Sequence, residues 1–374
     1  MEDSHGYADK LGLSEYDYES LLEKLQQREY EGTEYRYVPD YNTKVERGTV
    51  LVDGDVVRGF PKVPRTLVLS EGVPRYFDGE VVVEEKMNGY NTRVARIDGE
   101  KLAFSRSGIV CPFTTRFLRR VYGEELDALL DELPDAMVCG EVIGRDNPYT
   151  AHDYEGVDSL DLRVFDVRDK RTGESVPVEK RRRLCDEYGL PSVPFYGIHP
   201  VEDAPEEVHE VIKELDERGR EGVVMKTPDV TQQLKYTTSS ANQGDLAFAF
   251  LLPFDYGQDF MFRRIIREAF QAHEYDSEAE REERARSLGE SILGSMVDTV
   301  ERIDEGETVG ERHTVRATPE EVEALLGHLR SMGLQIVIEE DRHEDNERYV
   351  EFVKKTQSTN DKTANYLDGG IVRE

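Results

Sequence analysis

Cysteine is scarce in this chain. Its 374 residues include only Cys111, Cys139 and Cys185, and no two of them form a Cys-x-x-Cys pair. This pattern argues against a disulfide scaffold and against a cysteine-rich zinc site, and it favours a reducing compartment. The eight histidines are scattered and show no metal-ligand spacing.

Long apolar runs and a signal segment are also missing. The longest apolar run, Leu246 to Phe254, is far shorter than the roughly 20 residues that span a bilayer. The N-terminus, Met-Glu-Asp-Ser-His, carries neither a basic nor an apolar signal region. We therefore expect a soluble, cytoplasmic protein.

Lysine is the third scarce feature. The chain has 48 basic and 79 acidic residues and a formal net charge of −31, and only 14 of the basic residues are lysines. Such a composition is typical of a halophilic protein that is kept soluble in concentrated salt; an ordinary acidic cytosolic protein is the alternative. Because the Debye length is about 3 Å at 1 M salt, the charge argues against nucleic-acid binding only in a cell with little salt.

The length suggests two or three domains. The first 80 residues have the pattern of an N-terminal module, with a helix over 14–28 and strands over 35–38, 49–52 and 66–69. A cluster of aromatic side chains in this module is able to stack on bases, although a half-buried sheet is the more common setting for such a cluster. Its members are Tyr30, Tyr35, Tyr37 and Tyr41.

Residues 81–240 have the pattern of one mixed domain. The predicted helices span 114–133, 178–188 and 206–217. The predicted strands span 81–97, 101–108, 136–143, 162–167 and 221–226. Since the strands outnumber the helices without βαβ regularity, the pattern predicts an antiparallel-rich α+β fold.

The remainder has a mostly helical pattern. Residues 241–310 contain predicted helices over 259–273 and 279–303. Residues 311–374 form a small C-terminal domain, with a helix that begins at a Thr318 capping box and a strand over 334–338. One apolar stripe comprises Phe262, Ile265, Ile266, Ala269 and Phe270, and the other comprises Leu288, Ile292, Met296, Val300 and Ile303.

Two such helices, joined by an acidic turn, can leave part of one stripe exposed. A large exposed apolar patch usually marks an interface, and a symmetric dimer is the commonest way to cover it. The stripes therefore predict a homodimer built on residues 255–305. The alternative is that both stripes pack on the mixed domain.

The stretch 81–93 is the most informative. Three valines run into two acids and Lys86, and a turn with Asn88-Gly89 and a second strand follow, which places the lysine at a strand end. Lysine is a poor nucleophile at its usual pKa of about 10.4. It becomes a good one where burial or a nearby cation lowers that value. The alternative is a hairpin with one surface lysine.

Seven further candidates stand at the edges of strand-like runs in the same domain. They are Asn91, Arg106, Glu141, Phe165, Glu221, Lys226 and Lys235. Each alone has an ordinary explanation as a surface charge or a core aromatic. Together they match the needs of nucleotidyl transfer. A lysine must attack an α-phosphate, further cations must neutralise the charge that develops there, and an aromatic face can hold a purine. Carboxylates can hold a ribose hydroxyl or position Mg²⁺.

The order of these residues resembles the motifs of the covalent nucleotidyltransferase superfamily, which comprises ATP-dependent DNA and RNA ligases and mRNA capping enzymes. The motifs are Lys86-Met-Asn-Gly, Gly140-Glu141, Phe165-Asp166, Glu221-Gly-Val-Val-Met-Lys226 and Leu234-Lys235. Neither a Walker A loop nor a Rossmann glycine fingerprint is present in the sequence.

Within the superfamily, the chain most resembles the archaeal homodimeric ATP-dependent RNA ligases. Asn91 stands five positions after the lysine, where DNA ligases and capping enzymes usually have arginine. The region after Lys235 has a helical pattern rather than that of the five-stranded OB barrel of those enzymes. The order of module, catalytic domain, helical dimerisation region and small C-terminal domain is also similar over nearly the whole length. RNA ligases often have Lys-x-Lys at Lys235, and the single lysine here leaves open whether Lys226 or Lys235 contacts the α-phosphate.

The resemblance implies a role for each candidate. Lys86 would be the nucleophile that forms lysyl-AMP, and Glu221 would place a divalent metal, Mg²⁺ or alternatively Mn²⁺. The implied ATP-binding residues are Glu84, Glu85 and Met87 beside adenine, Phe165 stacked on it, Glu141 at the ribose, Asn91 and Arg106 at the ribose and phosphate or the RNA 5′-phosphate, and Lys226 and Lys235 at the α-phosphate.

The resemblance also implies a fold and an activity. The fold would be an antiparallel-rich adenylation domain of the ATP-grasp-like DNA and RNA ligase type, with an N-terminal module and helical C-terminal regions. The activity would be ATP-dependent joining of RNA 5′-phosphate and 3′-hydroxyl ends by a homodimer, without a membrane partner. The alternatives are a DNA ligase, a GTP-dependent capping enzyme and a non-catalytic protein that binds RNA ends.

Overall fold

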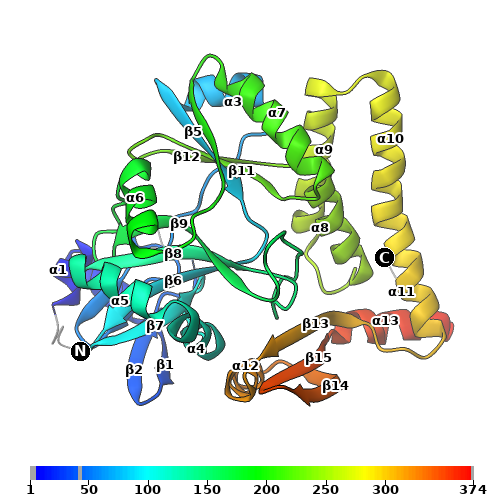
Figure 1. Cartoon of the computed structure of the whole chain (residues 1–374). Coiled ribbons are helices and arrows are strands. Elements are labelled where there is room, and N and C mark those ends of the chain that lie inside the picture. Colours follow the sequence, from blue (N-terminus) through cyan, green and yellow to red (C-terminus); the bar gives the residue numbers. More distant parts are fainter. Residues whose placement is uncertain (1–5, 41–43, 372–374) are drawn as a thin grey trace.

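The computed structural model describes residues 6–40 and 44–371 (Figure 1). The N-terminal segment Met-Glu-Asp-Ser-His and Tyr41 lie outside the described residues. Within the described ranges, no helix is both long and apolar enough to cross a membrane. The three cysteines are buried free thiols.

The described residues fold into four antiparallel sheets with helices packed around them, which confirms the predicted α+β class (Figure 1). The first sheet has the strand order β1 (Gln26–Tyr30), β2 (Thr33–Tyr37), β3 (Val50–Val52) and β4 (Asp55–Val57). It follows α1 (Tyr7–Leu11) and α2 (Glu15–Leu22). Its core includes the buried rings of Tyr30, Tyr35 and Tyr37, so these tyrosines have the structural role that was the alternative to base stacking.

Two predictions for this region were wrong. The helix predicted over 14–28 ends at Leu22, because 26–30 pair with 33–37 in a hairpin whose turn residues Glu31 and Gly32 both have positive φ. Cross-strand pairing outweighs a weak helix propensity here. The strand predicted over 66–69 instead leads into α3 (Leu69–Tyr76). Only Arg65 forms an isolated bridge with Lys235, next to Pro64, which has no N–H for a longer ladder.

Two central sheets carry most of the candidate residues. The second sheet has the order β10 (Phe195–Pro200), β5 (Glu80–Lys86), β11 (Gly222–Lys226) and β12 (Gln233–Thr237). The third has the order β7 (Glu100–Ser105), β6 (Tyr90–Ile97), β8 (Ala136–Ile143) and β9 (Asp161–Asp169). The chain crosses from one sheet to the other between β5 and β6.

Alternation along β5 separates a core face from a polar face. Val81 and Val83 belong to a buried cluster with residues of α3 and α7 (Ala204–Glu217), whereas Glu84 and Lys86 line a cavity. Helices α4 (Pro112–Val121), α5 (Gly123–Glu132) and α6 (Val178–Tyr188) form a second core with the third sheet. The single helix predicted over 114–133 is therefore two helices, which meet at Tyr122.

The C-terminal third begins with helices α8 (Ser239–Leu251), α9 (Gln258–Tyr275) and α10 (Glu278–Gly289). The π-helical turn η1 (Glu290–Gly294) connects α10 to α11 (Ser295–Asp304). A three-stranded sheet of β13 (Gly310–Ala317), β14 (Ile336–Glu344) and β15 (Glu347–Lys355) follows, with α12 (Pro319–Ser331) and α13 (Gln357–Leu367).

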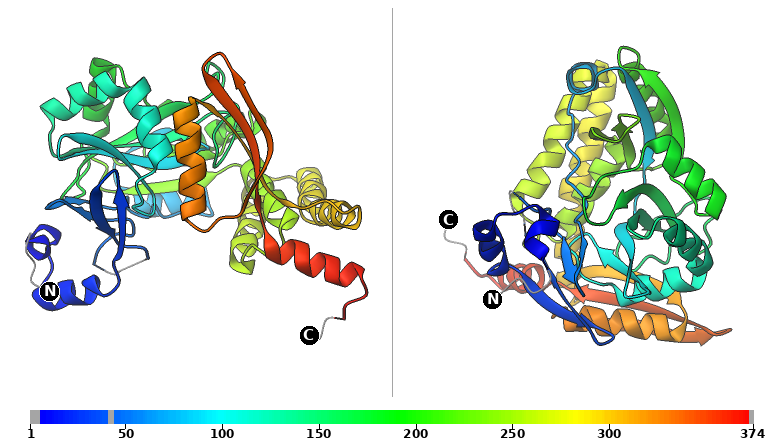
Figure 2. Two further views of the ribbon diagram at one scale, coloured as in Figure 1. Left: turned by 90° about the horizontal axis from the view of Figure 1, so that it is seen from below. Right: turned by 90° about the vertical axis from the view of Figure 1, so that its left-hand side faces the viewer.

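The mostly helical prediction for the C-terminus missed β13 and β15, and α12 has the predicted capping box at Thr318. This terminal unit packs back onto the helices beside the third sheet. Figure 2 shows α12 beside α4, where Phe113 shares a buried cluster with Leu325 and where Arg120 and Glu321 form an ion pair at 2.8 Å.

Candidate active site

The residues proposed from the sequence converge on one cavity of about 380 Å³ between the second and third sheets. Ten of the eleven line this cavity, and the eleventh, Glu221, contacts Lys86. The ten are Glu84, Glu85, Lys86, Met87, Asn91, Arg106, Glu141, Phe165, Lys226 and Lys235. Residues that are far apart in the sequence therefore share one site.

Lys86 is the last residue of β5, opposite Gly222 of β11. Gly222 has a φ of 141°, and a Cβ at this position would clash with the carbonyl oxygen of Tyr236. Glycine thus leaves one side of Lys86 open. Lys86 Nζ lies 2.6 Å from Glu221 Oε2, and the two side chains are 24% and 22% exposed. The ammonium is held in place yet remains accessible from the cavity.

A buried ion-pair cluster lies deeper in the cavity. Lys226 Nζ lies 2.8 Å from Glu84 Oε2 and donates to the Phe165 carbonyl oxygen at 2.8 Å. Arg181 of α6 donates to both carboxylate oxygens of Glu84. Burial alone would raise the pKa of Glu84, but the charges of Lys226 and Arg181 outweigh it and lower the pKa to about 2. Both charges of the Glu84–Lys226 pair are therefore satisfied within the protein.

Lys235 of β12 has a different environment. It lies opposite Val224 of β11 and on the same face of the sheet as Lys86. No carboxylate of the described residues lies within 4.0 Å of its Nζ. Burial, followed by the charges of Arg65 and Lys86, lowers its pKa to about 8. Lys235 is a crowded cation that an anion would stabilise.

The third sheet contributes an acceptor pair. Asn91 of β6 and Glu141 of β8 are direct cross-strand partners. Burial raises the pKa of Glu141 to about 8, opposed by the charge of Lys86 and supported by that of Glu221. Asn91 Oδ1 is buried and has no hydrogen-bond partner within residues 6–40 and 44–371. Buried acceptors are normally paired, so this one fits a donor on a ligand.

An apolar wall completes the cavity. Phe165 of β9 packs edge-on against Phe60, with ring centroids 5.2 Å apart and an interplanar angle of 82°. The guanidinium of Arg106 lies 5.5 Å from the Phe60 ring centroid and donates to the Pro61 carbonyl oxygen at 3.1 Å. Met87 is buried in a cluster that Phe165 packs against. These side chains offer an apolar aromatic surface beside a cation, which suits a purine ring.

Glu85 is the one candidate whose side chain points elsewhere. It alternates with Glu84 and Lys86 along β5, and Tyr196 Oη donates to its Oε2 at 3.1 Å. Burial raises the pKa of Glu85. We therefore assign its place in the cavity lining to the backbone.

Sequence reasoning missed Phe60 and Arg181. Phe60 belongs to the Arg-Gly-Phe-Pro-Lys segment of the N-terminal module, where the nearby Pro61 and Pro64 suggested a loop and hid its relation to the cavity. Arg181 lies within the run Lys180 to Arg183, whose composition suggests a solvated helix face. Nothing in this local pattern shows that Arg181 alone is buried against Glu84, 1% exposed.

The described residues contain no group of three or more His, Cys, Asp or Glu side chains that would hold a metal ion by themselves. Mg²⁺ is usually bound by one or two carboxylates together with substrate phosphates, and it does not require an all-protein cage. Glu221, a partly exposed carboxylate beside Lys86, fits that mode of binding.

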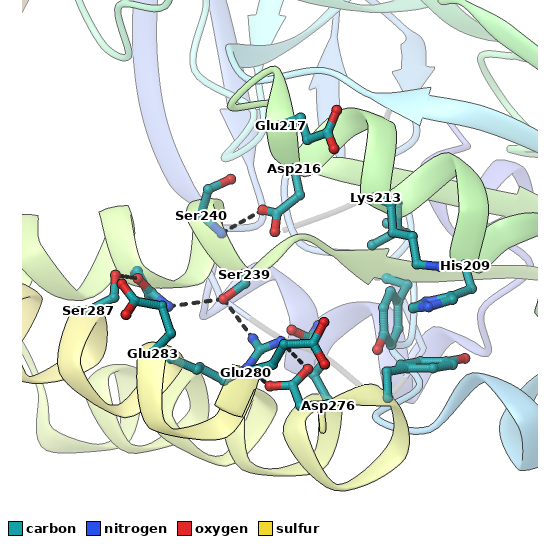
Figure 3. A pocket seen from close by; sticks show the side chains of 16 residues that line it. His209, Lys213, Asp216, Glu217, Ser239, Ser240, Asp276, Glu280, Glu283 and Ser287 are labelled. Carbon is teal, nitrogen blue, oxygen red and sulfur yellow. Dashed lines mark hydrogen bonds and ion pairs between the residues drawn. The ribbon is translucent and has the colours of Figure 1, made fainter. Parts of the chain in front are cut away.

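A second pocket, of about 550 Å³, lies between α7, α8, α9 and α10 and contains none of the eleven candidates (Figure 3). Figure 3 shows Asp216, Asp276, Glu280 and Glu283 around it. Its arginine, Arg284, is neutralised by Glu268 and Asp276, at 2.9 and 2.5 Å. Its lysine, Lys213, is paired with Glu210 at 2.7 Å. This pocket is larger than the first cavity. Its two permanently charged basic side chains, Arg284 and Lys213, are already paired with carboxylates, and its lining contains more acidic than basic residues.

Comparison with known proteins agrees with the fold and with the cavity. A sequence model described as RNA ligase matches residues 79–239, and another, described as the C-terminal region of ligase Pab1020, matches residues 248–370. An uncharacterized protein of Methanocaldococcus jannaschii is 37% identical over 99% of this chain and 97% of its own length.

Two solved structures are similar over nearly their whole length. An archaeal ATP-dependent RNA ligase has a TM-score of 0.91 and 41% identity, with 98% of each chain covered. A protein from Aquifex aeolicus, provisionally named an ATP-dependent DNA ligase, has a TM-score of 0.89 and 28% identity, with 96% of this chain and 100% of that chain covered. The fold is therefore that of the ATP-dependent ligases of the nucleotidyltransferase class. The chain belongs to the archaeal ATP-dependent RNA ligase family, which confirms the assignment made from the order of its motifs.

Proposed function

We propose that this ligase joins RNA 5′-phosphate and 3′-hydroxyl ends through a lysyl-AMP intermediate and an adenylated RNA 5′ end. The observation that carries the proposal is the position of Lys86. Its amine, held by Glu221, opens onto a cavity with an apolar aromatic wall on one side. On another side lies the Lys235 ammonium, which has no carboxylate within 4.0 Å among the described residues. A nucleophile, a base-binding surface and a phosphate-binding cation lie together there.

In the first step, the neutral amine of Lys86 attacks the α-phosphorus of ATP. A bond forms between Nζ and phosphorus, and the bond between phosphorus and the oxygen of the β-phosphate breaks. The electron pair leaves with pyrophosphate. Lys86 must first lose a proton, and the Glu221 carboxylate at 2.6 Å is placed to accept it and pass it to solvent.

The charges of the cavity support further roles in this step. Lys235 stabilises the α-phosphate, because Lys226 is already neutralised by Glu84 whereas Lys235 has no carboxylate partner among the described residues. Arg106 supports it from the aromatic wall. Glu221 would hold Mg²⁺ or Mn²⁺ together with the phosphates of ATP. When bound, this metal would shield the phosphate charge.

The remaining residues recognise the nucleoside. The Phe165 and Phe60 wall and Met87 accept the adenine ring. Asn91 Oδ1 accepts a hydrogen bond from a ribose hydroxyl, which gives this buried atom a partner. With a pKa of about 8, Glu141 is protonated at neutral pH and can both donate to and accept from the ribose.

Two transfers follow. An oxygen of the RNA 5′-phosphate attacks the phosphorus of lysyl-AMP, the bond from Lys86 Nζ to phosphorus breaks, and the amine takes up a proton. The 3′-hydroxyl of the second end then attacks the 5′-phosphorus of the adenylated RNA, loses its proton and releases AMP. Each step exchanges one bond at one phosphorus atom.

Labelled nucleotides test the chemistry. Protein incubated with α-labelled ATP should retain an acid-labile label after denaturation, and GTP should give none. Lys86→Ala and Lys86→Arg should abolish labelling, since arginine stays protonated. The exposed Lys213→Ala serves as the control and should label normally. If Lys86→Ala is still labelled, another residue is the nucleophile. If the wild-type protein is not labelled, the chain is better described as a non-catalytic protein that binds RNA ends.

The substrate requires a separate test. Because a protein of the same architecture is provisionally named a DNA ligase, both 5′-phosphorylated RNA and nicked or single-stranded DNA must be offered. We expect sealing of RNA ends, with transient adenylated RNA, at a rate far above that for DNA. Equal or faster sealing of DNA contradicts the RNA assignment but leaves the lysyl-AMP chemistry intact.

A further inference from the structure

Two guanidiniums stand at the outer edge of the second sheet, next to Lys235. The segment 64–66 runs along β12, with hydrogen bonds from Lys235 N to the Pro64 carbonyl oxygen at 3.0 Å and from Thr66 N to the Lys235 carbonyl oxygen at 3.3 Å. Arg65 therefore lies one position farther from Lys86 across the sheet than Lys235 does. Arg267 reaches the same edge from α9.

A short chain of neutral side chains holds the two guanidiniums. Arg65 Nη1 donates to Thr237 Oγ1 at 2.7 Å, and Thr237 Oγ1 donates to Asn242 Oδ1 at 3.0 Å. Arg267 Nη1 donates to the same Asn242 oxygen at 3.3 Å. The orientation of the Asn242 amide is fixed because its Nδ2 donates to Glu268 Oε1 at 2.9 Å. Arg65 and Arg267 are thus oriented without being neutralised.

Neither guanidinium has a carboxylate within 4.0 Å in the part of the chain that the structure describes. This is notable in a protein with 79 acidic residues and a net charge of −31. The nearby carboxylates serve other cations: Glu221 is paired with Lys86 at 2.6 Å, and Asp245 with Arg264 at 2.7 Å.

The two arginines also repel each other. Burial, followed by the charge of Arg267, lowers the pKa of Arg65 to about 10. Burial and the charge of Arg264 lower the pKa of Arg267 to about 10. Both side chains are half-buried, and each uses one of its five N–H donors in a hydrogen bond within the described residues. An anion would relieve the repulsion and use the remaining donors.

The position of the pair indicates which anion. Phosphoryl transfer proceeds with the attacking and leaving groups roughly in line. Pyrophosphate therefore leaves the α-phosphorus on the side away from Lys86. If Lys235 holds the α-phosphate, Arg65 and Arg267 lie beyond it on that side. Guanidinium forks match phosphate oxygens bidentately.

We propose that Arg65 and Arg267 form a phosphate-binding pair that holds the β- and γ-phosphates of ATP and then the departing pyrophosphate. The proposal rests on the function proposed above. The same pair would also suit a phosphate of the RNA backbone, so the test must separate the two sources of phosphate.

The variants are Arg65→Gln and Arg267→Gln, in full-length protein at a fixed high salt concentration. Arg263→Gln is the matched control. It removes the same charge from the helix that carries Arg267, but its side chain is 62% exposed and paired with Asp259 at 2.7 Å. Three quantities are measured: the Kd of inorganic pyrophosphate by calorimetry, the KM for ATP in Lys86 adenylation, and the rate of sealing pre-adenylated RNA without ATP.

We expect each variant to raise the pyrophosphate Kd and the KM for ATP by roughly tenfold or more, the effect of losing a charge-assisted hydrogen bond. Sealing of pre-adenylated RNA should change by less than about twofold, as should all three quantities in Arg263→Gln. The conservative Arg65→Lys and Arg267→Lys should recover part of the loss if charge is what matters.

Other results overturn the proposal. If only the sealing of pre-adenylated RNA weakens, the pair binds RNA phosphate and the pyrophosphate assignment is wrong. Three unchanged quantities, or equal effects in Arg263→Gln, mean that no phosphate site exists at this edge. Thermal unfolding shows whether a glutamine variant is misfolded. If it is, the corresponding Arg→Lys variant takes its place in the three measurements. If the wild-type protein never forms an adduct, the proposed function fails, while the calorimetry still tests the pair.

Discussion

Lys86 Nζ and Glu221 Oε2 lie 2.6 Å apart across the strands β5 and β11. A charge-assisted contact of this length fixes the direction of the lysine side chain and keeps its amine beside a base. The same carboxylate is the one proposed to hold the metal, so Glu221 changes partner when ATP and metal arrive. The two roles predict different kinetics.

We expect Glu221→Gln to slow Lys86 adenylation by about 10²-fold, because a neutral amide neither accepts the proton nor attracts a cation. A metal titration of the adenylation rate separates the roles. Loss of a metal ligand raises the half-saturating metal concentration, whereas loss of the base lowers the rate at every concentration. Glu217→Gln, an exposed acid nearby, is the control. A rate within about twofold of wild type would remove Glu221 from both roles.

We predict that Lys235 supports the reaction but lowers the free energy of unfolding of the protein. A lysine whose pKa falls from 10.5 to about 8 on folding contributes stability only above pH 10.5, and this contribution is lost as the pH falls toward 8. Lys235→Met should therefore be more stable at pH 7, by an amount on the order of 1–3 kcal/mol. The difference should shrink as the pH rises from 8 toward 10.5.

Urea unfolding of wild type and Lys235→Met at pH 7 and pH 10 measures this difference. The variant should lose adenylation while it gains stability. Lys213→Met, on an exposed helix face, should show no pH-dependent gain. A Lys235→Met protein that is less stable at pH 7, or whose difference from wild type does not depend on pH, contradicts the proposed crowding of cations.

The sequence predicted the catalytic strands because they combine two strong signals. In β5 and β11, runs of consecutive valines mark a strand that is buried on both faces, and charged residues at the strand ends mark a site. The N-terminal hairpin and the strand β13 give weaker signals, since their alternating polar residues also suit an exposed helix or a loop. Their strand structure comes from partners elsewhere in the chain.

The roles of individual charges were less predictable. Lys226 and Lys235 are similar in sequence context, yet one is buried against Glu84 and the other has no such partner among the described residues. Arg181, which binds Glu84, and Arg65, whose charge lowers the pKa of Lys235, both lie outside the motifs. Such charge assignments depend on tertiary distances, which no local pattern contains.

Salt should stabilise this protein and its activity. The net charge of −31 makes the folded chain repel itself at low ionic strength, and the Debye length falls to about 3 Å at 1 M salt. We expect the Tm and the rate of RNA sealing to rise between about 0.1 M and 1 M KCl. RNA binding by ordinary proteins weakens over the same range through counterion release. Highest sealing at low salt, with loss above it, would contradict salt adaptation.

The predicted homodimer now has a better-defined surface. The π-turn η1 adds a residue to one helical turn and rotates the face that follows. Ile292 and Met296, which belong to the second predicted stripe, are half-buried, whereas Leu293 and Val297 are 66% and 45% exposed. Phe262 on α9 is 61% exposed. A dimer that covers this face should therefore depend on Leu293 and Val297 rather than on Ile292 and Met296.

Light scattering at high salt tests this surface. The wild-type mass should be twice 42.8 kDa, and Leu293→Asp with Val297→Asp should halve it, because a buried charge without a partner opposes association. Ile198→Asp, at an exposed apolar position on β10, is the control and should leave the mass doubled. Lys86 adenylation should persist in the monomer, since the cavity lies within the first 240 residues. A wild-type mass near 42.8 kDa refutes the dimer.

Lowering the salt concentration should also dissociate the dimer. Two chains of charge −31 repel each other at low salt, while the free energy of apolar burial changes little.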